Sequence, residues 1–503
     1  MVSNPASCAL AAAAFCGLSG PAFSVAQDGE VGPVEDGFPR ESDFVETVSY
    51  PIPEGLELEV SGIAILPDGR PLVCTRRGEV YVVLDGGADD LSGARFHKFA
   101  EGLQEPLGLV ADEDGWIYTA QRGEISRMRD DDGDDSMDRL EVVADDWEIS
   151  GNYHEYNFGP RRAPDGSLWF TTNKPFGSEP FGSVAWRGFA MRVEDGSAVP
   201  KAAGLRSPAG LQFSPWGDLF YTDNQGEWCG ASKMSLVEPG GYHGHPHGVP
   251  SCGDERWQFP LPPEHKSGIL MPDFAREEAM FQLPAVWFPY DKVGRSPAGF
   301  VWDTEGHFGP FRGQCFVVDQ YEALVMRVSL EQVQGHWQGA VYRFREGLAC
   351  GAIRAAWGAD GSLLVGETNR GWGGKGHASL GLERLRWKGN MPFEVLSTHV
   401  QPGGFELRFT LPVDVGSAAE VGSYGLKSYT YLLHSDYGSP EVEVQELEVT
   451  GAVPAADGLS VRLAVKGLRE GYVHEFDLSG LRSARGLPLL HDQAYYTLIK
   501  FHR

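Results

Sequence analysis

The chain has 503 residues, more than one hydrophobic core normally organises, so more than one domain is expected. Its 42 lysines and arginines are outnumbered by 70 aspartates and glutamates, which gives a net charge of −28 at pH 7. Nucleic acids and anionic membranes repel a chain this acidic, so neither is an expected partner. The acidity itself is typical of a soluble protein or of a saline habitat.

Residues 1–26 have the features of a secretory signal peptide. They carry no charged side chain, an Ala-rich run from Ala9 to Phe15 and the small-x-small pattern Ser24-Val25-Ala26. No Lys or Arg precedes the apolar run, which departs from the usual pattern. The run is too short to span a membrane, and no later stretch has about twenty apolar residues. We therefore expect an exported protein, periplasmic or extracellular, with no membrane span.

Five cysteines follow the predicted signal peptide, so at least one has no partner within the chain. Cys229 and Cys252 flank a segment rich in Gly, Pro and His. A disulfide between them suits an exported protein, and buried free thiols are an equal alternative.

A strand, a turn with glycine and a second strand recur six times after an acidic, Gly/Pro-rich lead-in at residues 27–44. The turn glycines are 46 to 55 residues apart, with one longer step of 89. Hairpins with this period indicate a β-propeller, because a small sheet buries both faces only when neighbouring sheets stack on it. We predict six blades over residues 45–390, with an insertion at about residues 229–290. The turn glycines are Gly69, Gly115, Gly166, Gly217, Gly306 and Gly361.

Residues 391–503 change to apolar and polar residues that alternate with period two, separated by turn signals. This pattern predicts a small C-terminal β-sandwich, so the whole chain is expected to be all-β. It shows no catalytic constellation, and a packing or assembly role is favoured.

Three motifs follow one another between Gly204 and Pro246: RSPAGL, NQGE and GGYHGHP. This segment resembles the soluble glucose/sorbosone dehydrogenases, six-bladed propellers that hold pyrroloquinoline quinone (PQQ) and calcium. Those proteins show Arg-Asn-Pro-Gln-Gly-Leu, Glu-Gln-Gly-Pro and Gly-Gly-Asn-Tyr-Gly-Trp-Pro in the same order. A closer resemblance is to dehydrogenase-like propeller proteins of planctomycetes. The resemblance spans roughly residues 45–390 and is strongest from 150 to 246.

The resemblance implies two catalytic residues. His154 lies ahead of the third hairpin, where the family has the general base that takes a sugar hydroxyl proton, and imidazole has a suitable pKa. The alternative for His154 is a buried ring bonded to a neighbouring carbonyl. Arg206 matches the family arginine that contacts the cofactor and the developing charge, while Ser207 replaces a family Asn.

The resemblance also implies a cofactor and metal loop at Asn224–Glu227. Asn224 and Gln225 are expected to contact the cofactor. Gly226 and Glu227 stand where two family carbonyls ligate calcium, and the Glu227 carboxylate adds an oxygen suited to a hard cation.

The family also clamps the PQQ carboxylates with a Lys-Arg pair and an Arg-x-Arg motif. The corresponding regions here are Asp319–Glu322 and Cys350–Arg354, so we expect less positive charge around the cofactor. Arg370 and Lys375 are the candidates that replace part of it.

The run DDDGDDSMD at residues 130–138 places carboxylates at alternate positions around a glycine. Oxygens from Asp130, Asp132, Asp134 and Asp138 are predicted to converge on one structural Ca²⁺. The spacing differs from that of an EF-hand, and a solvated acidic turn is the alternative.

These observations favour an exported quinoprotein-like oxidoreductase that oxidises a sugar or related alcohol with PQQ and calcium and passes electrons to an external acceptor. One alternative is a propeller that binds a carbohydrate or a protein without turnover. Another is a calcium-dependent lactonase-like hydrolase.

Overall fold

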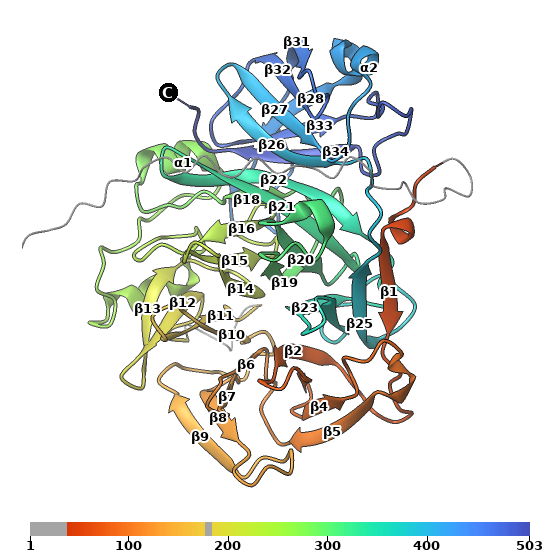
Figure 1. Cartoon of the computed structure of the whole chain (residues 1–503). Helices are drawn as coiled ribbons and strands as arrows, with labels where there is room; N and C mark the ends of the chain where they lie inside the picture. Colours follow the sequence, from red (N-terminus) through yellow and green to blue (C-terminus); the bar gives the residue numbers. More distant parts are fainter. Residues whose placement is uncertain (1–37, 177–183, 503) are drawn as a thin grey trace, which may run out of the picture.

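The computed structural model describes residues 38–176 and 184–502, so the predicted signal peptide lies outside the described residues. Six four-stranded antiparallel units are arranged in a ring around a common axis (Figure 1). The fold is therefore the predicted six-bladed β-propeller.

The blades follow one another along the chain. Blade 1 is β2 (Val60–Ile65), β3 (Pro71–Thr75), β4 (Val80–Leu84) and β5 (Arg95–Ala100). Blade 2 is β6 (Leu109–Ala111), β7 (Ile117–Ala120), β8 (Ile125–Arg129) and β9 (Arg139–Ala144). Blade 3 is β10 (Asn157–Arg162), β11 (Leu168–Thr172), β12 (Phe189–Glu194) and β13 (Ser197–Ala203). Blade 4 is β14 (Gly210–Phe213), β15 (Leu219–Asp223), β16 (Ser232–Leu236) and β18 (Val286–Phe288). Blade 5 is β19 (Pro297–Trp302), β20 (Cys315–Asp319), β21 (Leu324–Val333) and β22 (His336–Arg345).

Both ends of the propeller segment build blade 6. β23 (Ala352–Trp357), β24 (Leu363–Thr368) and β25 (Leu380–Trp387) come from its end, and the outer strand β1 (Val45–Ser49) comes from its start. β1 pairs antiparallel with β25, with Val45 opposite Trp387. The ring of blades is thus closed by hydrogen bonds between its first and last strands.

The six predicted turn glycines lie between the first and second strands of their blades. Their φ angles are all positive, from +77° at Gly361 to +92° at Gly217. Glycine adopts this left-handed conformation without steric cost, which explains its recurrence at the same place in each unit. The predicted equivalence of the six turns is confirmed.

The C-terminal residues form the predicted sandwich. One sheet is β26 (Val395–Gln401), β27 (Gly404–Phe409), β32 (Ser460–Lys466) and β31 (Glu448–Pro454). The other is β34 (Gln493–Leu498), β33 (Tyr472–Asp477), β28 (Gly425–Thr430) and β30 (Val442–Glu446). β34 also pairs with β22, so blade 5 and this second sheet make one sheet of eight strands (Figure 1).

The predicted insertion at residues 229–290 is shorter than expected, because β16 and β18 within it are strands of blade 4. Between them lie η3 (Pro246–Gly253), β17 (Ile269–Leu270) and helix α1 (Met271–Glu277). β17 pairs with β29 (Leu432–Leu433), which ties the insertion to the sandwich. The remaining short elements are η1 (Glu41–Asp43), η2 (Leu91–Gly93), η4 (Gly309–Phe311), α2 (Val415–Ala419) and η5 (Val421–Ser423). In the described ranges no helix has the length and apolarity needed to cross a bilayer.

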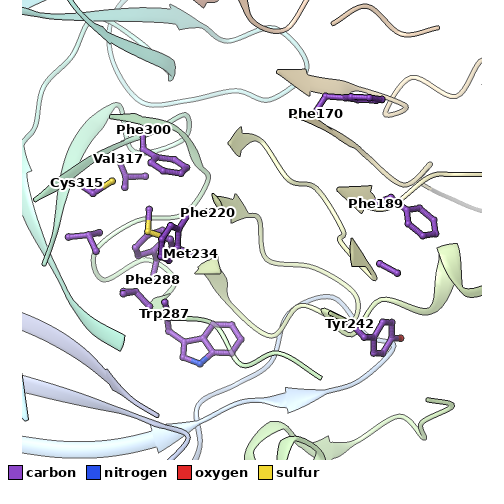
Figure 2. Packing of buried hydrophobic residues seen from close by; sticks show 14 of the residues in the cluster. Phe170, Phe189, Phe220, Met234, Tyr242, Trp287, Phe288, Phe300, Cys315 and Val317 are labelled. Atoms are coloured by element: carbon purple, nitrogen blue, oxygen red, sulfur yellow. The ribbon is translucent and has the colours of Figure 1, made fainter. Parts of the chain in front are cut away.

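The largest buried cluster joins blades 2 to 5 to the sandwich. Figure 2 shows Phe220, Trp287 and Phe300 packed within it. Tyr431, from the sandwich side, lies 4.9 Å from the ring of Trp287. Cys229 and Cys252 are both buried and free, so the disulfide considered between them is not formed and the alternative of buried thiols holds. Burial raises the pKa of each thiol to about 12, so neither is ionised at neutral pH.

Candidate functional site

A cavity of about 270 Å³ lies on the propeller axis. Its floor is formed by residues at or just before the first strands of blades 2 to 6, which meet at the axis: Leu107, Phe158, Ala209, Ala298 and Ile353. Its volume is near the lower end of the roughly 300–1,000 Å³ typical of small-molecule sites. His154, Arg206, Asn224 and Arg370, all predicted site residues, line this one cavity.

Four arginines line the cavity, and three of them are paired with carboxylates. Arg76 pairs with Glu105, which also holds Arg122. Arg206 donates to Glu227 at 3.0 Å, and Arg370 donates to Glu59 at 2.9 Å. Arg206 and Arg370 were predicted at the site and Arg354 lies in the Cys350–Arg354 region that corresponds to one family clamp, whereas Arg76 was not predicted.

Arg354 is the fourth arginine and is only 4 % exposed. It donates to the carbonyls of Ala209, Leu107 and Ile353, and among residues 38–176 and 184–502 it has no carboxylate partner. Burial lowers the pKa of Arg354, and repulsion from Arg161 lowers it further, yet a guanidinium stays protonated at neutral pH. A buried cation without an anion is costly, so this cavity is electrostatically suited to an anionic ligand.

His154 is held at the cavity wall through its backbone. Its N–H donates to Asn152 Oδ1 at 2.9 Å, and its carbonyl accepts from Asn173 Nδ2 at 2.7 Å. The imidazole stacks on Phe176 with ring centres 4.3 Å apart. Among the described residues no group hydrogen-bonds to its ring nitrogens, in contrast to the alternative of a ring bonded to a carbonyl.

The cavity keeps His154 neutral. Burial lowers its pKa to about 4, with contributions from the positive charges of Arg206 and Lys174. A neutral imidazole has a free lone pair at pH 7, which is the form that accepts a proton. The anion that the arginines favour would act in the opposite direction and raise this pKa.

The segment that carries Arg206 is fixed by a buried carboxylate at the end of β15. Asp223 accepts the N–H groups of Arg206 at 3.1 Å and of Ser207 at 2.6 Å. The carboxylate of Glu227 then fixes the guanidinium, and it also pairs with Lys174. Burial alone would raise the pKa of the Glu227 carboxyl. The positive charges of Arg206 and Lys174 outweigh burial and lower this pKa to about 2.

The predicted calcium seat has other partners. The Gly226 carbonyl accepts the N–H groups of Cys229 at 3.1 Å and of Gly438 at 3.0 Å. The Glu227 carboxylate is occupied by Arg206 and Lys174. A calcium ion at the Gly226 carbonyl or at the Glu227 carboxylate would have to displace these donors, whereas the Glu227 carbonyl accepts no hydrogen bond from the described residues.

Gln225 also differs from its predicted role. Its side-chain amide donates to the Gly230 carbonyl at 3.1 Å and lies against Gly438, away from the residues that line the cavity. Gln225 thus holds the loop together, while Asn224 is the residue of this loop that reaches the cavity.

The sequence prediction missed three lining residues with clear physical roles. Arg76 follows β3, Arg354 lies within the apolar strand β23, and Tyr437 belongs to the C-terminal sandwich. An arginine in a strand otherwise made of Ala, Ile and Trp is a signal for the second of these. Tyr437 has no local signal, because its position depends on how the sandwich packs.

The acidic run at residues 130–138 lies in the turn between β8 and β9, away from the cavity. Ligand oxygens of Asp130, Asp132 and Asp138 lie within 4.8 Å of one another. Asp134, the fourth predicted ligand, is not in this group. Three converging carboxylates fit a Ca²⁺ site better than a site for a softer cation.

We expect Ca²⁺ to stabilise the protein through this turn, because a ligand that binds only the native state raises stability. Asp132→Ala should lower the melting temperature measured in Ca²⁺ and leave it unchanged in chelator. Calorimetric scans of the parent and of Asp132→Ala, each in Ca²⁺ and in chelator, make the comparison. Asp134→Ala is the control, and its melting temperature in Ca²⁺ should fall less than that of Asp132→Ala. Equal melting temperatures of the parent with and without Ca²⁺ would show that no such site exists.

Comparisons with known proteins give one family match. The family described as "Domain of unknown function (DUF7133)" matches residues 44–249. A comparison with curated proteins gives no match.

Similar solved structures include three sugar dehydrogenases. A glucose dehydrogenase-type oxidoreductase of Thermus thermophilus is 21 % identical, with a TM-score of 0.48 over 68 % of this chain and 99 % of that one. The PQQ-bound aldose sugar dehydrogenase of Streptomyces coelicolor is 16 % identical, with a TM-score of 0.48 over 68 % and 98 %. The soluble aldose sugar dehydrogenase of Escherichia coli, in its apo form, is 17 % identical, with a TM-score of 0.46 over 68 % and 99 %.

Proposed function

We propose that the protein is an oxidoreductase that oxidises a sugar or related alcohol with PQQ bound in the axial cavity. The observation that carries this proposal is Arg354, a buried cation without a carboxylate partner among the described residues, in a cavity lined by three further arginines. A proton acceptor, neutral His154, lies in the wall of the same cavity. A small sugar is the proposed substrate, and an external acceptor is proposed to receive the electrons.

The residues present fit a flat tricarboxylate. Arg76, Arg206, Arg354 and Arg370 supply planar donor groups that match carboxylate geometry. Phe176, Phe158 and Tyr156 supply apolar walls for a ring system. Arg354, without a competing carboxylate in the described part of the chain, is proposed to hold one ligand carboxylate, and Arg370 and Arg206 to hold others beside their existing partners.

The bound quinone would supply the site that accepts a hydride from a carbon atom. His154 is proposed to take the proton of the substrate hydroxyl at a ring nitrogen. Phe176 fixes the plane of the imidazole by stacking, and Asn152 and Asn173 fix its backbone. Arg206, held by Glu227, is proposed to stabilise the negative charge that develops on the substrate oxygen.

The proposed chemistry does not rely on calcium, because protein donors occupy the Gly226 carbonyl and the Glu227 carboxylate, two of the oxygens predicted to bind it. A lactonase-like centre is not favoured either. Among the described residues, the one group of three acidic or metal-ligating side chains lies in the turn after β8 and not in the cavity.

The test is retention of PQQ. We expect the purified protein to retain the quinone absorbance through gel filtration in chelator, and then to reduce a dye when sugars are added. Arg354→Met should lose PQQ retention, whereas Arg386→Met, in β25 outside the cavity lining and paired with Asp89 and Asp360, should retain it. A parent protein that releases PQQ in both chelator and Ca²⁺ would overturn the proposal and favour a binding propeller without turnover.

A further inference from the structure

The C-terminal sandwich reaches the cavity through the loop at residues 434–439, between β29 and β30. Three main-chain hydrogen bonds hold it against the loop that follows β15. The N–H of Gly438 donates to Gly226 O at 3.0 Å, and the N–H of Trp228 donates to His434 O at 2.7 Å. The N–H of Ser439 donates to Gly230 O at 2.8 Å, so these contacts dock the loop through its backbone.

The Tyr437 side chain takes no part in this docking. Its ring lines the cavity while 57 % of the residue stays exposed. Its centre lies 5.2 Å from the Arg206 guanidinium, which lies 4.5 Å from the ring of Phe176. Arg206 is thus in contact range of one ring from the propeller and one from the sandwich.

A second half-exposed ring lines the same cavity. Trp372 is 42 % exposed and belongs to the loop between β24 and β25 of blade 6. Exposed aromatic rings that line a cavity have a free apolar face, and such surfaces mark binding sites. Asn224 also lines the cavity, and its side-chain oxygen Oδ1 is buried with no hydrogen-bond partner among the described residues.

We propose that Tyr437 binds the substrate, and that the substrate is a cyclic polyol such as a pyranose. A pyranose has a C–H face that packs on an aromatic ring and hydroxyl groups at its edge that donate to an acceptor such as Asn224 Oδ1. The inference rests on the proposed sugar-oxidising function. It makes the C-terminal sandwich part of the substrate site, so the propeller alone is incomplete.

The test compares Tyr437→Ala with Tyr437→Phe in the full chain loaded with PQQ, using D-glucose and a dye acceptor. Loss of one aromatic contact of about 1.4 kcal/mol corresponds to a 10-fold change. We expect Tyr437→Ala to raise KM about 10-fold, with kcat within about 2-fold of the parent. Tyr437→Phe keeps the ring face and should leave KM near the parent value. Val453→Ala, at an exposed position in β31, is the control.

The main-chain docking predicts that both variants melt at the parental temperature and retain PQQ equally. A Tyr437→Ala protein with unchanged KM would overturn the inference, and so would a KM that rises equally in Tyr437→Phe. If the parent binds no PQQ, the proposed function fails, and calorimetric titration of the cofactor-free chain with D-glucose decides the inference. Binding that only Tyr437→Ala loses supports it, and no binding by the parent overturns it.

Discussion

His154→Ala should lower the turnover of the PQQ-loaded protein by about 10²- to 10⁴-fold, the usual contribution of a positioned general base. Melting temperature and PQQ retention should change little, because Asn152 and Asn173 hold the backbone of residue 154 rather than its ring. Steady-state kinetics with D-glucose and a dye acceptor measure the effect. Normal turnover in this variant would end the assignment of His154 as the base, while leaving the cavity unchanged.

The same residue predicts the pH dependence. The pKa of His154 is about 4 in the cofactor-free protein, lowered by burial and by the charges of Arg206 and Lys174. A bound tricarboxylate raises it towards the ordinary value of about 6.5. We expect kcat/KM to fall as pH drops through a value between those two, because protonated imidazole cannot accept the substrate proton. A profile in His154→Ala with the same acidic limb would assign that limb to another group.

Trp287→Ala should lower the free energy of unfolding by about 3–5 kcal/mol, the usual cost of deleting a buried Trp side chain. Trp287 in β18 is 1 % exposed, and its backbone N–H donates to Thr497 Oγ1 of the sandwich at 2.8 Å. Its ring packs on Tyr431, so a cavity here weakens the contact between blade 4 and the sandwich.

Trp216→Ala is the matched control. Trp216 is 54 % exposed and stacks on Trp337 with ring centres 5.0 Å apart, so about 0.5–1.5 kcal/mol should be lost. Calorimetry and urea unfolding monitored by fluorescence measure both variants. Equal losses in the two would contradict the role given to Trp287 at this junction.

Local patterns predicted the blades because each hairpin is short and self-contained. The turn around Gly166, for example, needs a positive φ and two flanking apolar strands, and all of these are visible in about fifteen residues. β1 has no such signal, since its partner β25 is far away in the sequence and only ring closure brings them together. The ends of the insertion were missed for a related reason, as β18 pairs across a long excursion with β16.

His154 and Arg206 were predicted through the family resemblance, and both line the axial cavity. The contribution of Arg354 to the positive charge of the cavity was not predicted, because Arg354 lines the cavity from within a strand whose other residues are apolar. The alternation of side chains along a strand places each one on one of the two faces of the sheet. It does not indicate which of these side chains borders the axial cavity. The ion pair between Glu227 and Lys174 could not be predicted from the sequence either, since Lys174 belongs to another blade.

Ring closure by β1 also sets the order in which the molecule can fold. β1 leaves the ribosome among the first described segments, but its partner β25 ends only at Trp387. Until then β1 has no partner strand, and an unpaired strand edge can pair with other chains. Blade 6 is therefore expected to assemble last, after a slow search typical of contacts between distant parts of a chain. A protein with this design benefits from staying unfolded until its whole length is available.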